Sequence, residues 1–112
     1  MTERISRQAF LGAEGVHDWR VLGDAATAYF RTGTFAKGVA LIDAIGVLAD
    51  EANHHPDVDL RYRAVTVRLS THDVGGLSER DVELARRISR AAEELGIGAD
   101  PSALDDDERR SG

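Results

Sequence analysis

The sequence contains no cysteine in its 112 residues, and this absence excludes several kinds of chemistry. Without cysteine there is no disulfide framework, no thiolate nucleophile and no sulfur ligand for a metal ion. No apolar run approaches the roughly 20 residues needed to span a bilayer, and residues 1–10 lack the basic-then-apolar order of a secretory signal. We therefore expect a cytoplasmic protein with no membrane partner, whose chemistry depends on histidine, carboxylate, hydroxyl or backbone groups.

Basic residues are fewer than acidic ones, which restricts the partners that we expect. The sequence has 14 lysine and arginine residues against 20 aspartate and glutamate residues, giving a formal net charge of -6. Nucleic-acid binding needs clustered positive charge on one face, so this balance disfavours a nucleic-acid partner. With 112 residues, of which 42% are hydrophobic, the chain is long enough for one domain with one core.

Apolar periodicity predicts a long amphipathic helix from Thr34 to Asn53. Its predicted buried stripe recurs every three or four positions and consists of Phe35, Val39, Ile42, Ile45, Leu48 and Ala52. Pro56 cannot continue this helix and disfavours helical geometry at His55, so the helix should end near His54. The two adjacent histidines are therefore predicted at a helix terminus.

Two further helices are predicted on either side of this one. A short helix runs from Ser6, which can cap it, to about Glu14. A longer one opens at Ser78–Asp81 in the manner of a capping box and stops at Gly96. Its apolar stripe is Val82, Ala85, Ile88, Ala92 and Leu95.

Strand signals fill the segments between the helices. Trp19–Leu22 and Ala26–Arg31 are β-prone, and the intervening Gly23-Asp24 suits a type II′ turn, so we expect a hairpin. Residues 60–71 alternate apolar and polar side chains, which predicts an antiparallel strand with one solvated face. Val58–Tyr62 is a candidate partner strand, and a turn at Asp57–Asp59 would let the chain double back.

This order of elements predicts an α+β domain over residues 1–100, with helices covering one face of an antiparallel sheet. Residues 101–112 carry a dense charge run without apolar periodicity, and we expect an acidic, solvated or mobile tail. Such a tail could also join a further domain in a longer chain.

Three of the four histidines, His54, His55 and His72, lie in two predicted loops that flank one strand. Imidazole exchanges protons near neutral pH, so a pair can supply both the acid and the base of a reaction. Two interpretations remain open on spacing alone. The histidines can form a proton-transfer site, or His54 and His55 can simply end a helix while His72 occupies a surface loop.

Neighbouring residues admit alternatives as well. Three histidines can hold zinc, but adjacent residues at a helix end point in different directions and the helical HExxH spacing is missing, so a metal site is disfavoured. Asp81 can serve only as the capping-box acid of Ser78 or can act in the site. Gly75-Gly76 can expose amides to an anion or can simply provide positive φ.

The same residues resemble the signature of the pterin-4a-carbinolamine dehydratases. The resemblance rests on an ungapped series of elements over the central third of the chain: Asn53-His54-His55-Pro56, Tyr62, residues 65–73 (VTVRLSTHD) and residues 76–81 (GLSERD). The intervals between the HHP, STH and GLSERD elements are those of the family. Before this region, Trp19 and the helix beginning at Phe35 follow the family's order of elements.

The resemblance implies a fold and an activity. The implied fold is a four-stranded antiparallel sheet with three helices on one face, in the order αββαββα. The implied reaction is loss of water from 4a-hydroxytetrahydropterin to give quinonoid dihydropterin, in recycling the cofactor of an aromatic amino-acid hydroxylase. No metal or organic cofactor is implied, and the chain is expected to form a homodimer or homotetramer.

The resemblance also implies roles for individual residues. His54, His55, His72 and Asp81 would form the catalytic group, with Asp81 orienting a histidine or stabilising its cation and His54 favoured for proton transfer opposite His72. The pterin ring would contact the three histidines together with Asn53, Ser70, Thr71 and Asp73, with Asp50 as an outer acidic partner. Asp50 replaces a frequent glutamate of the family, and Val58 replaces a common aromatic residue. The alternative function is a non-catalytic binding or assembly module that retains this fold.

Overall fold

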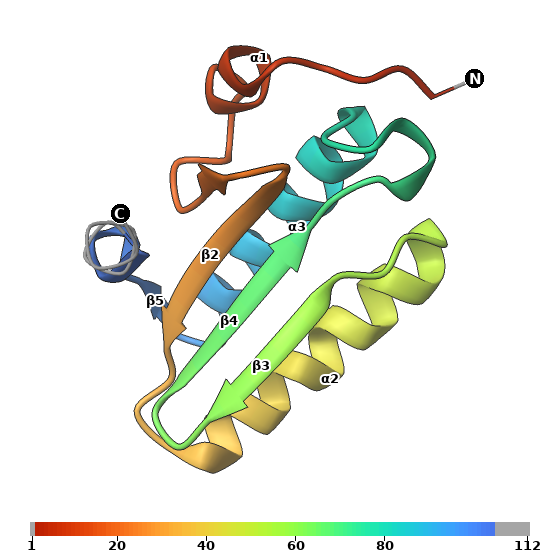
Figure 1. The fold of residues 1–112 in the computed structure, drawn as a ribbon. Coiled ribbons are helices and arrows are strands. Elements are labelled where there is room, and N and C mark those ends of the chain that lie inside the picture. The colour runs from red at the N-terminus through yellow and green to blue at the C-terminus, as the bar shows by residue number, and fades with distance from the viewer. Residues whose placement is uncertain (1, 105–112) are drawn as a thin grey trace.

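A computed structural model describes residues 2–104 as one antiparallel sheet with two long helices packed on one face (Figure 1). The elements, in chain order, are α1 (Arg7–Leu11), β1 (Arg20–Leu22), β2 (Ala25–Arg31), α2 (Phe35–Ala52), β3 (Asp57–Arg61), β4 (Ala64–Leu69), η1 (His72–Val74), α3 (Glu79–Glu94) and β5 (Gly98–Ala99). In this part of the chain no helix is long and apolar enough to cross a membrane.

The sheet has the strand order β1-β2-β4-β3, and β5 pairs with the far end of β2. The predicted α+β class with an antiparallel sheet is confirmed, whereas the predicted number of four strands is wrong. The fifth strand is only two residues long and follows Gly96, whose φ of +71° turns the chain back toward Arg31. Two residues carry no alternation that a sequence pattern can reveal. The short 3-10 helix η1 is a further addition to the predicted order.

Both hairpins form, although one turn lies elsewhere than predicted. The β1-β2 hairpin closes through Gly23-Asp24, where Gly23 has a φ of +63°, as a type II′ turn requires. In the second hairpin Asp57 pairs with Arg68 and Arg61 with Ala64. The predicted turn at Asp57–Asp59 is therefore wrong, because these residues belong to β3 and the chain reverses at residues 62–63.

Helix α2 has the predicted limits but not the predicted buried stripe. It is capped by Thr34, whose hydroxyl accepts a hydrogen bond from the Lys37 amide, and it ends at Asn53. The buried residues are Gly38, Leu41, Ile45 and Ala49. Of the predicted stripe, Ile45 is buried, Ile42 and Leu48 are half-buried, and Phe35, Val39 and Ala52 are exposed.

A close approach at Gly38 explains this rotation of the helix. A Cβ atom at Gly38 would lie 2.6 Å from Cδ1 of Leu60 in β3 and 3.4 Å from Cγ2 of Val65 in β4. The closest approach of α2 to the sheet is therefore made at a glycine, which a periodicity of large apolar residues does not take into account. As a result, α2 leaves large apolar side chains exposed.

The other predicted helices agree more closely with the structure. The Ser6 hydroxyl caps α1, which ends at Leu11 rather than near Glu14. Helix α3 buries Val82, Ala85, Ile88 and Ala92, while Leu95 is partly exposed at its end. These side chains pack with Phe10, Trp19 and Phe30 in the core between helices and sheet. Residues 101–104 form a helical turn with Leu104 buried, so these four are ordered, and the rest of the predicted tail lies outside the described residues.

Candidate active site

The register of β3 and β4 brings the two histidine segments to the same end of the sheet. Because Asp57 at the start of β3 pairs with Arg68 near the end of β4, residues 53–56 and 70–76 emerge side by side. The end of α2 leads into the first segment, and the second leads into the start of α3 (Figure 1). Four elements thus converge on one small region.

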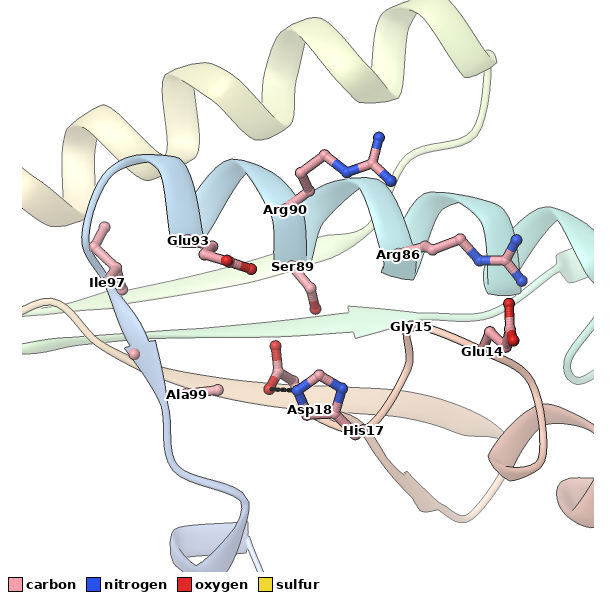
Figure 2. A pocket seen from close by; sticks show the side chains of 11 residues that line it. Glu14, Gly15, His17, Asp18, Arg86, Ser89, Arg90, Glu93, Ile97 and Ala99 are labelled. Atoms are coloured by element: carbon pink, nitrogen blue, oxygen red, sulfur yellow. Dashed lines mark ion pairs between the residues drawn. The ribbon is translucent and has the colours of Figure 1, made fainter.

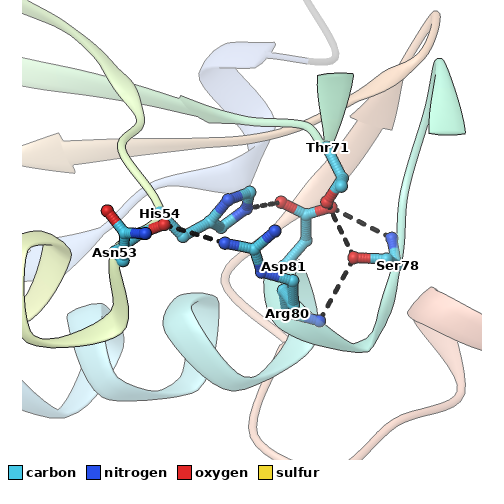
Figure 3. Close-up of polar contacts among 6 residues, drawn as sticks. All are labelled: Asn53, His54, Thr71, Ser78, Arg80 and Asp81. Carbon is cyan, nitrogen blue, oxygen red and sulfur yellow. Dashed lines mark hydrogen bonds and ion pairs between the residues drawn. The ribbon is translucent and has the colours of Figure 1, made fainter. Parts of the chain in front are cut away.

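Asp81, in the first turn of α3, is the centre of a buried polar network in this region (Figure 3). Its Oδ1 lies 2.6 Å from Nε2 of His54. Its Oδ2 accepts hydrogen bonds from the Thr71 hydroxyl at 2.7 Å and from the Ser78 amide at 3.0 Å. Asp81 is fully buried, and the exposed fractions of His54 and Thr71 are only 8% and 2%. A buried carboxylate needs such donors, because it has lost its hydration.

The network fixes the direction of its hydrogen bonds. The Thr71 hydroxyl donates its one proton to Asp81, so it must accept the 2.7 Å hydrogen bond from the Ser78 hydroxyl. The Ser78 oxygen in turn accepts from the Arg80 amide. A carboxylate can only accept hydrogen bonds, so the short contact with Oδ1 of Asp81 places a proton on Nε2 of His54. Neutral His54 therefore carries its proton on Nε2 and an unprotonated Nδ1.

Asp81 makes the contacts that both of its predicted roles would require. Together with Ser78 it completes a capping box. The Ser78 hydroxyl accepts from the Arg80 amide, and the Asp81 carboxylate accepts from the Ser78 amide. The same carboxylate also holds His54. Helix capping and orientation of a histidine are thus combined in one side chain, so the start of α3 and the histidine are structurally coupled.

His54 is fixed through its backbone as well as its ring. Asn53, which ends α2, adopts the left-handed conformation with φ 48° and ψ 45°, and the His54 amide donates to the carbonyl oxygen of Ala49. The ring borders a hollow of about 310 Å³ whose wall includes Ala52, Arg80 and Leu84. The predicted helix-end location of the histidine pair is confirmed.

His55 and His72 are exposed, in contrast to His54. Nε2 of His55 lies 2.9 Å from Oδ1 of Asp50 one turn earlier in α2, which is the acidic partner that the resemblance implied. His72 and Asp73 lie on η1, and within residues 2–104 their side chains have no hydrogen bond or ion pair. The structure thus brings His54 to Asp81 and His55 to Asp50, while His72 faces solvent at the same end of the sheet.

The other residues predicted to contact the pterin ring also differ in whether their side chains have a hydrogen-bond partner. The side chains of Asn53 and Ser70 have no polar partner among the described residues, whereas the Thr71 hydroxyl is committed to Asp81. Gly75 has a φ of +64°, as the conformational interpretation required. The anion interpretation is wrong, because the Gly75 amide donates to His72 and the Gly76 amide donates to Thr71. No group of three potential ligands in residues 2–104 is arranged to hold a metal ion.

Sequence reasoning missed two contributors to this region. One is the hydrogen bond between Thr71 and Ser78, which joins residues seven apart across the η1 loop. The other is Arg80, whose Nη2 donates to the Asn53 carbonyl at 2.8 Å and so joins α3 to the end of α2. Neither has a local sequence signal, since both depend on how distant segments meet.

A larger cleft of about 610 Å³ lies elsewhere, between α3, the α1-β1 connection and β5 (Figure 2). It contains the fourth histidine, His17, whose Nε2 lies 3.4 Å from Asp18. In its wall the Ser89 hydroxyl accepts from Nε1 of Trp19. None of the residues singled out for proton transfer lines this cleft.

Comparison with known proteins gives a consistent result. A family model described as Pterin 4 alpha carbinolamine dehydratase matches residues 2–91. Proteins named "Putative pterin-4-alpha-carbinolamine dehydratase" are similar in sequence: the one from Nocardia farcinica is 40% identical over 92 residues, covering 81% of this chain and 97% of its own. One from Halobacterium salinarum is 46% identical over 70 residues, covering 62% and 77%.

A solved structure shares the fold. The crystal structure titled as a transcriptional coactivator/pterin dehydratase from Brucella melitensis aligns with a TM-score of 0.73 at 24% sequence identity. The alignment covers 80% of this chain and 99% of that one. The match of the family model over most of the domain, and not the fold alone, shows that the chain belongs to the pterin-4-alpha-carbinolamine dehydratase family.

Proposed function

We propose that this protein removes water from 4a-hydroxytetrahydropterin to give quinonoid dihydropterin, in pterin cofactor recycling beside an aromatic amino-acid hydroxylase. The observation that carries the proposal is the buried His54–Asp81 pair, flanked by exposed His55 and His72 at one end of the sheet. Family membership supplies the substrate class, and this geometry supplies groups suited to its chemistry.

The reaction requires two proton transfers. The hydroxyl at C4a leaves as water when an acid protonates its oxygen, and a base removes the proton from the adjacent ring nitrogen, so that a carbon–nitrogen double bond forms. Imidazoles in opposite protonation states can perform both steps near neutral pH. The proton gained by the base balances the proton lost by the acid, so exchange with solvent restores the starting state.

The arrangement supports distinct roles for the histidines. Asp81 holds the Nε2 proton of His54, which leaves Nδ1 as a basic nitrogen with no partner among the described residues. This is the logic by which a buried aspartate keeps a catalytic histidine in one tautomer. We assign His54 as the base and exposed His72 as the acid, with His55, oriented by Asp50, against the pterin ring.

The proposal is tested by measuring 4a-hydroxytetrahydropterin dehydration with the wild type and His54→Ala. Loss of a general acid or base typically lowers the rate about 10²–10⁴-fold, and we expect His54→Ala and His72→Ala to fall in this range. His17→Ala is the matched control, because His17 lies in the separate cleft. A wild-type rate equal to the spontaneous background, or His54→Ala equal to the wild type, would refute the proposal.

A non-catalytic binding or assembly module is the second candidate function. Such a module needs a docking surface, and the exposed apolar surface of α2 can provide one, since Phe35, Val39 and Val47 are 53%, 40% and 58% exposed. We propose that this surface joins copies of the chain in a homodimer or homotetramer. Self-association is compatible with catalysis, so the dehydration assay, and not the oligomeric state, separates the two functions.

A further inference from the structure

Arg80 and Asp81 are consecutive residues in the first turn of α3, and both reach the segment that carries His54 (Figure 3). Asp81 binds the His54 ring. Arg80 instead donates from Nη2 to the carbonyl oxygen of Asn53, at 2.8 Å. One helix turn therefore contacts the histidine segment twice, once at the side chain and once at the backbone.

The peptide unit between Asn53 and His54 is held at both of its polar groups. Its carbonyl accepts from Arg80, and its N–H donates to the Ala49 carbonyl at 3.1 Å. Asn53 needs this support, because its φ of 48° lies in the left-handed region, which is unfavourable for residues other than glycine. Asparagine tolerates this region better than most residues, but its surroundings must still select it.

We propose that Arg80 is a positioning residue for the dehydratase reaction, which fixes the direction of the Asn53–His54 peptide and thereby the placement of the His54 and His55 side chains. The inference rests on the proposed function and adds a residue to which that function gave no role. Without Arg80, the peptide would keep only the hydrogen bond from its N–H to Ala49, and a change in its direction would move the His54 ring relative to Asp81.

The kinetic test compares Arg80→Met, Arg80→Lys and Arg87→Met. Methionine keeps an unbranched apolar stem but donates nothing to the Asn53 carbonyl, so we expect kcat for dehydration to fall about tenfold, with KM within about twofold, as for a small misplacement of a catalytic group. Lysine can still donate one hydrogen bond and should restore part of kcat. Arg87 is the control, because its ion pairs with Glu51 and Glu83 are long, at 4.0 and 3.9 Å.

A second measurement does not depend on activity. Hydrogen exchange of the His54 amide reports on the same peptide unit, and we expect Arg80→Met to accelerate it about tenfold while Arg87→Met does not. If the wild type proves inactive but this exchange effect appears, the proposed function fails and the positioning of the peptide stands.

Two results would overturn the inference. One is wild-type kcat and wild-type His54 exchange in Arg80→Met. The other is a loss of kcat in Arg80→Met that is no larger than the loss in Arg87→Met. A loss that is fully explained by a smaller folded fraction, measured by urea unfolding, would count against the inference in the same way. A tenfold lower kcat in a fully folded variant, partly restored by lysine, supports it.

Discussion

At the scale of single residues, the chemistry of Asp81 can be tested by a substitution that keeps its shape. In Asp81→Asn, the amide oxygen can still accept from Thr71 and Ser78, but the NH₂ group then faces Nε2 of His54. Nε2 must become an acceptor, so the ring proton moves to Nδ1 and the proposed base is lost. We expect kcat to fall about 10²–10⁴-fold, and ¹⁵N NMR of the ring to show the exchanged tautomer.

The matched control for this prediction is Glu79→Gln. Glu79 is an exposed acid in the same first turn of α3 and has no hydrogen bond or ion pair with His54. It should keep both the wild-type rate and the Nε2–H tautomer. An Asp81→Asn variant that retained the Nε2–H tautomer at full activity would show that Asp81 serves α3 as a cap and not the reaction.

Sequence reasoning identified these residues but not their burial. The HHP and GLSERD elements predicted His54 and Asp81 as site residues, and the capping box predicted the bond between Asp81 and Ser78. Neither element indicates that His54 is buried while His55 is exposed, because adjacent residues at a helix end diverge according to the φ and ψ of Asn53. The Arg80 hydrogen bond to the Asn53 carbonyl accompanies that left-handed conformation, and this tertiary contact has no local sequence signal.

At the scale of elements, Asp100 joins β5 to the sheet and makes this junction sensitive to acid. Its carboxylate accepts from Ser102 and from Arg31, and its amide donates to Tyr29. The Ser102 hydroxyl and then the Arg31 guanidinium lower the pKa of Asp100 below its ordinary value of 3.8. A carboxyl group whose pKa is lower in the folded than in the unfolded chain stabilises the folded state. This stabilisation is complete when the pH is above the ordinary pKa, and it disappears as the pH falls through the pKa of the folded state.

We therefore expect the C-terminal junction to open locally below about pH 4. The measurement is the hydrogen-exchange protection factor of the residue-100 amide, corrected for intrinsic exchange, between pH 6 and pH 2.5. Asp100→Asn should lower this protection at neutral pH and remove its acid dependence. Asp24→Asn is the control, since Asp24 is an exposed acid in the β1-β2 turn. Equal acid dependence in Asp100→Asn and the wild type would contradict the prediction.

The elements also show where sequence patterns lose information. The limits of α2 followed from Thr34, the apolar repeat and Pro56, because capping and chain termination are local effects. The buried face of α2 did not follow from these local signals, because its close contact with β3 and β4 is made at Gly38. The short strand β5 has too few residues for any period, and its pairing with β2 depends on a tertiary contact.

At the scale of the whole molecule, the rotation of α2 has a consequence for assembly. Because α2 buries the face that contains Gly38, the large apolar side chains of Phe35, Val39 and Val47 remain exposed. Several large apolar side chains on one exposed helix are unusual unless they contact a partner. The proposed partner is a second copy of the chain, in the homodimer or homotetramer that the family resemblance implies.

The test is light scattering of the wild type and of Val47→Glu. A chain of 12.1 kDa should scatter as two or four copies, and a buried carboxylate at position 47 should shift the population toward single copies. Leu11→Glu is the control, because Leu11 is an exposed apolar residue on α1, away from this surface. A wild type that scatters as one copy at all concentrations contradicts the prediction, whereas dissociation of Leu11→Glu alone places the interface on α1. If His54–Asp81 and its surroundings act within one copy, dissociated Val47→Glu should keep the wild-type kcat.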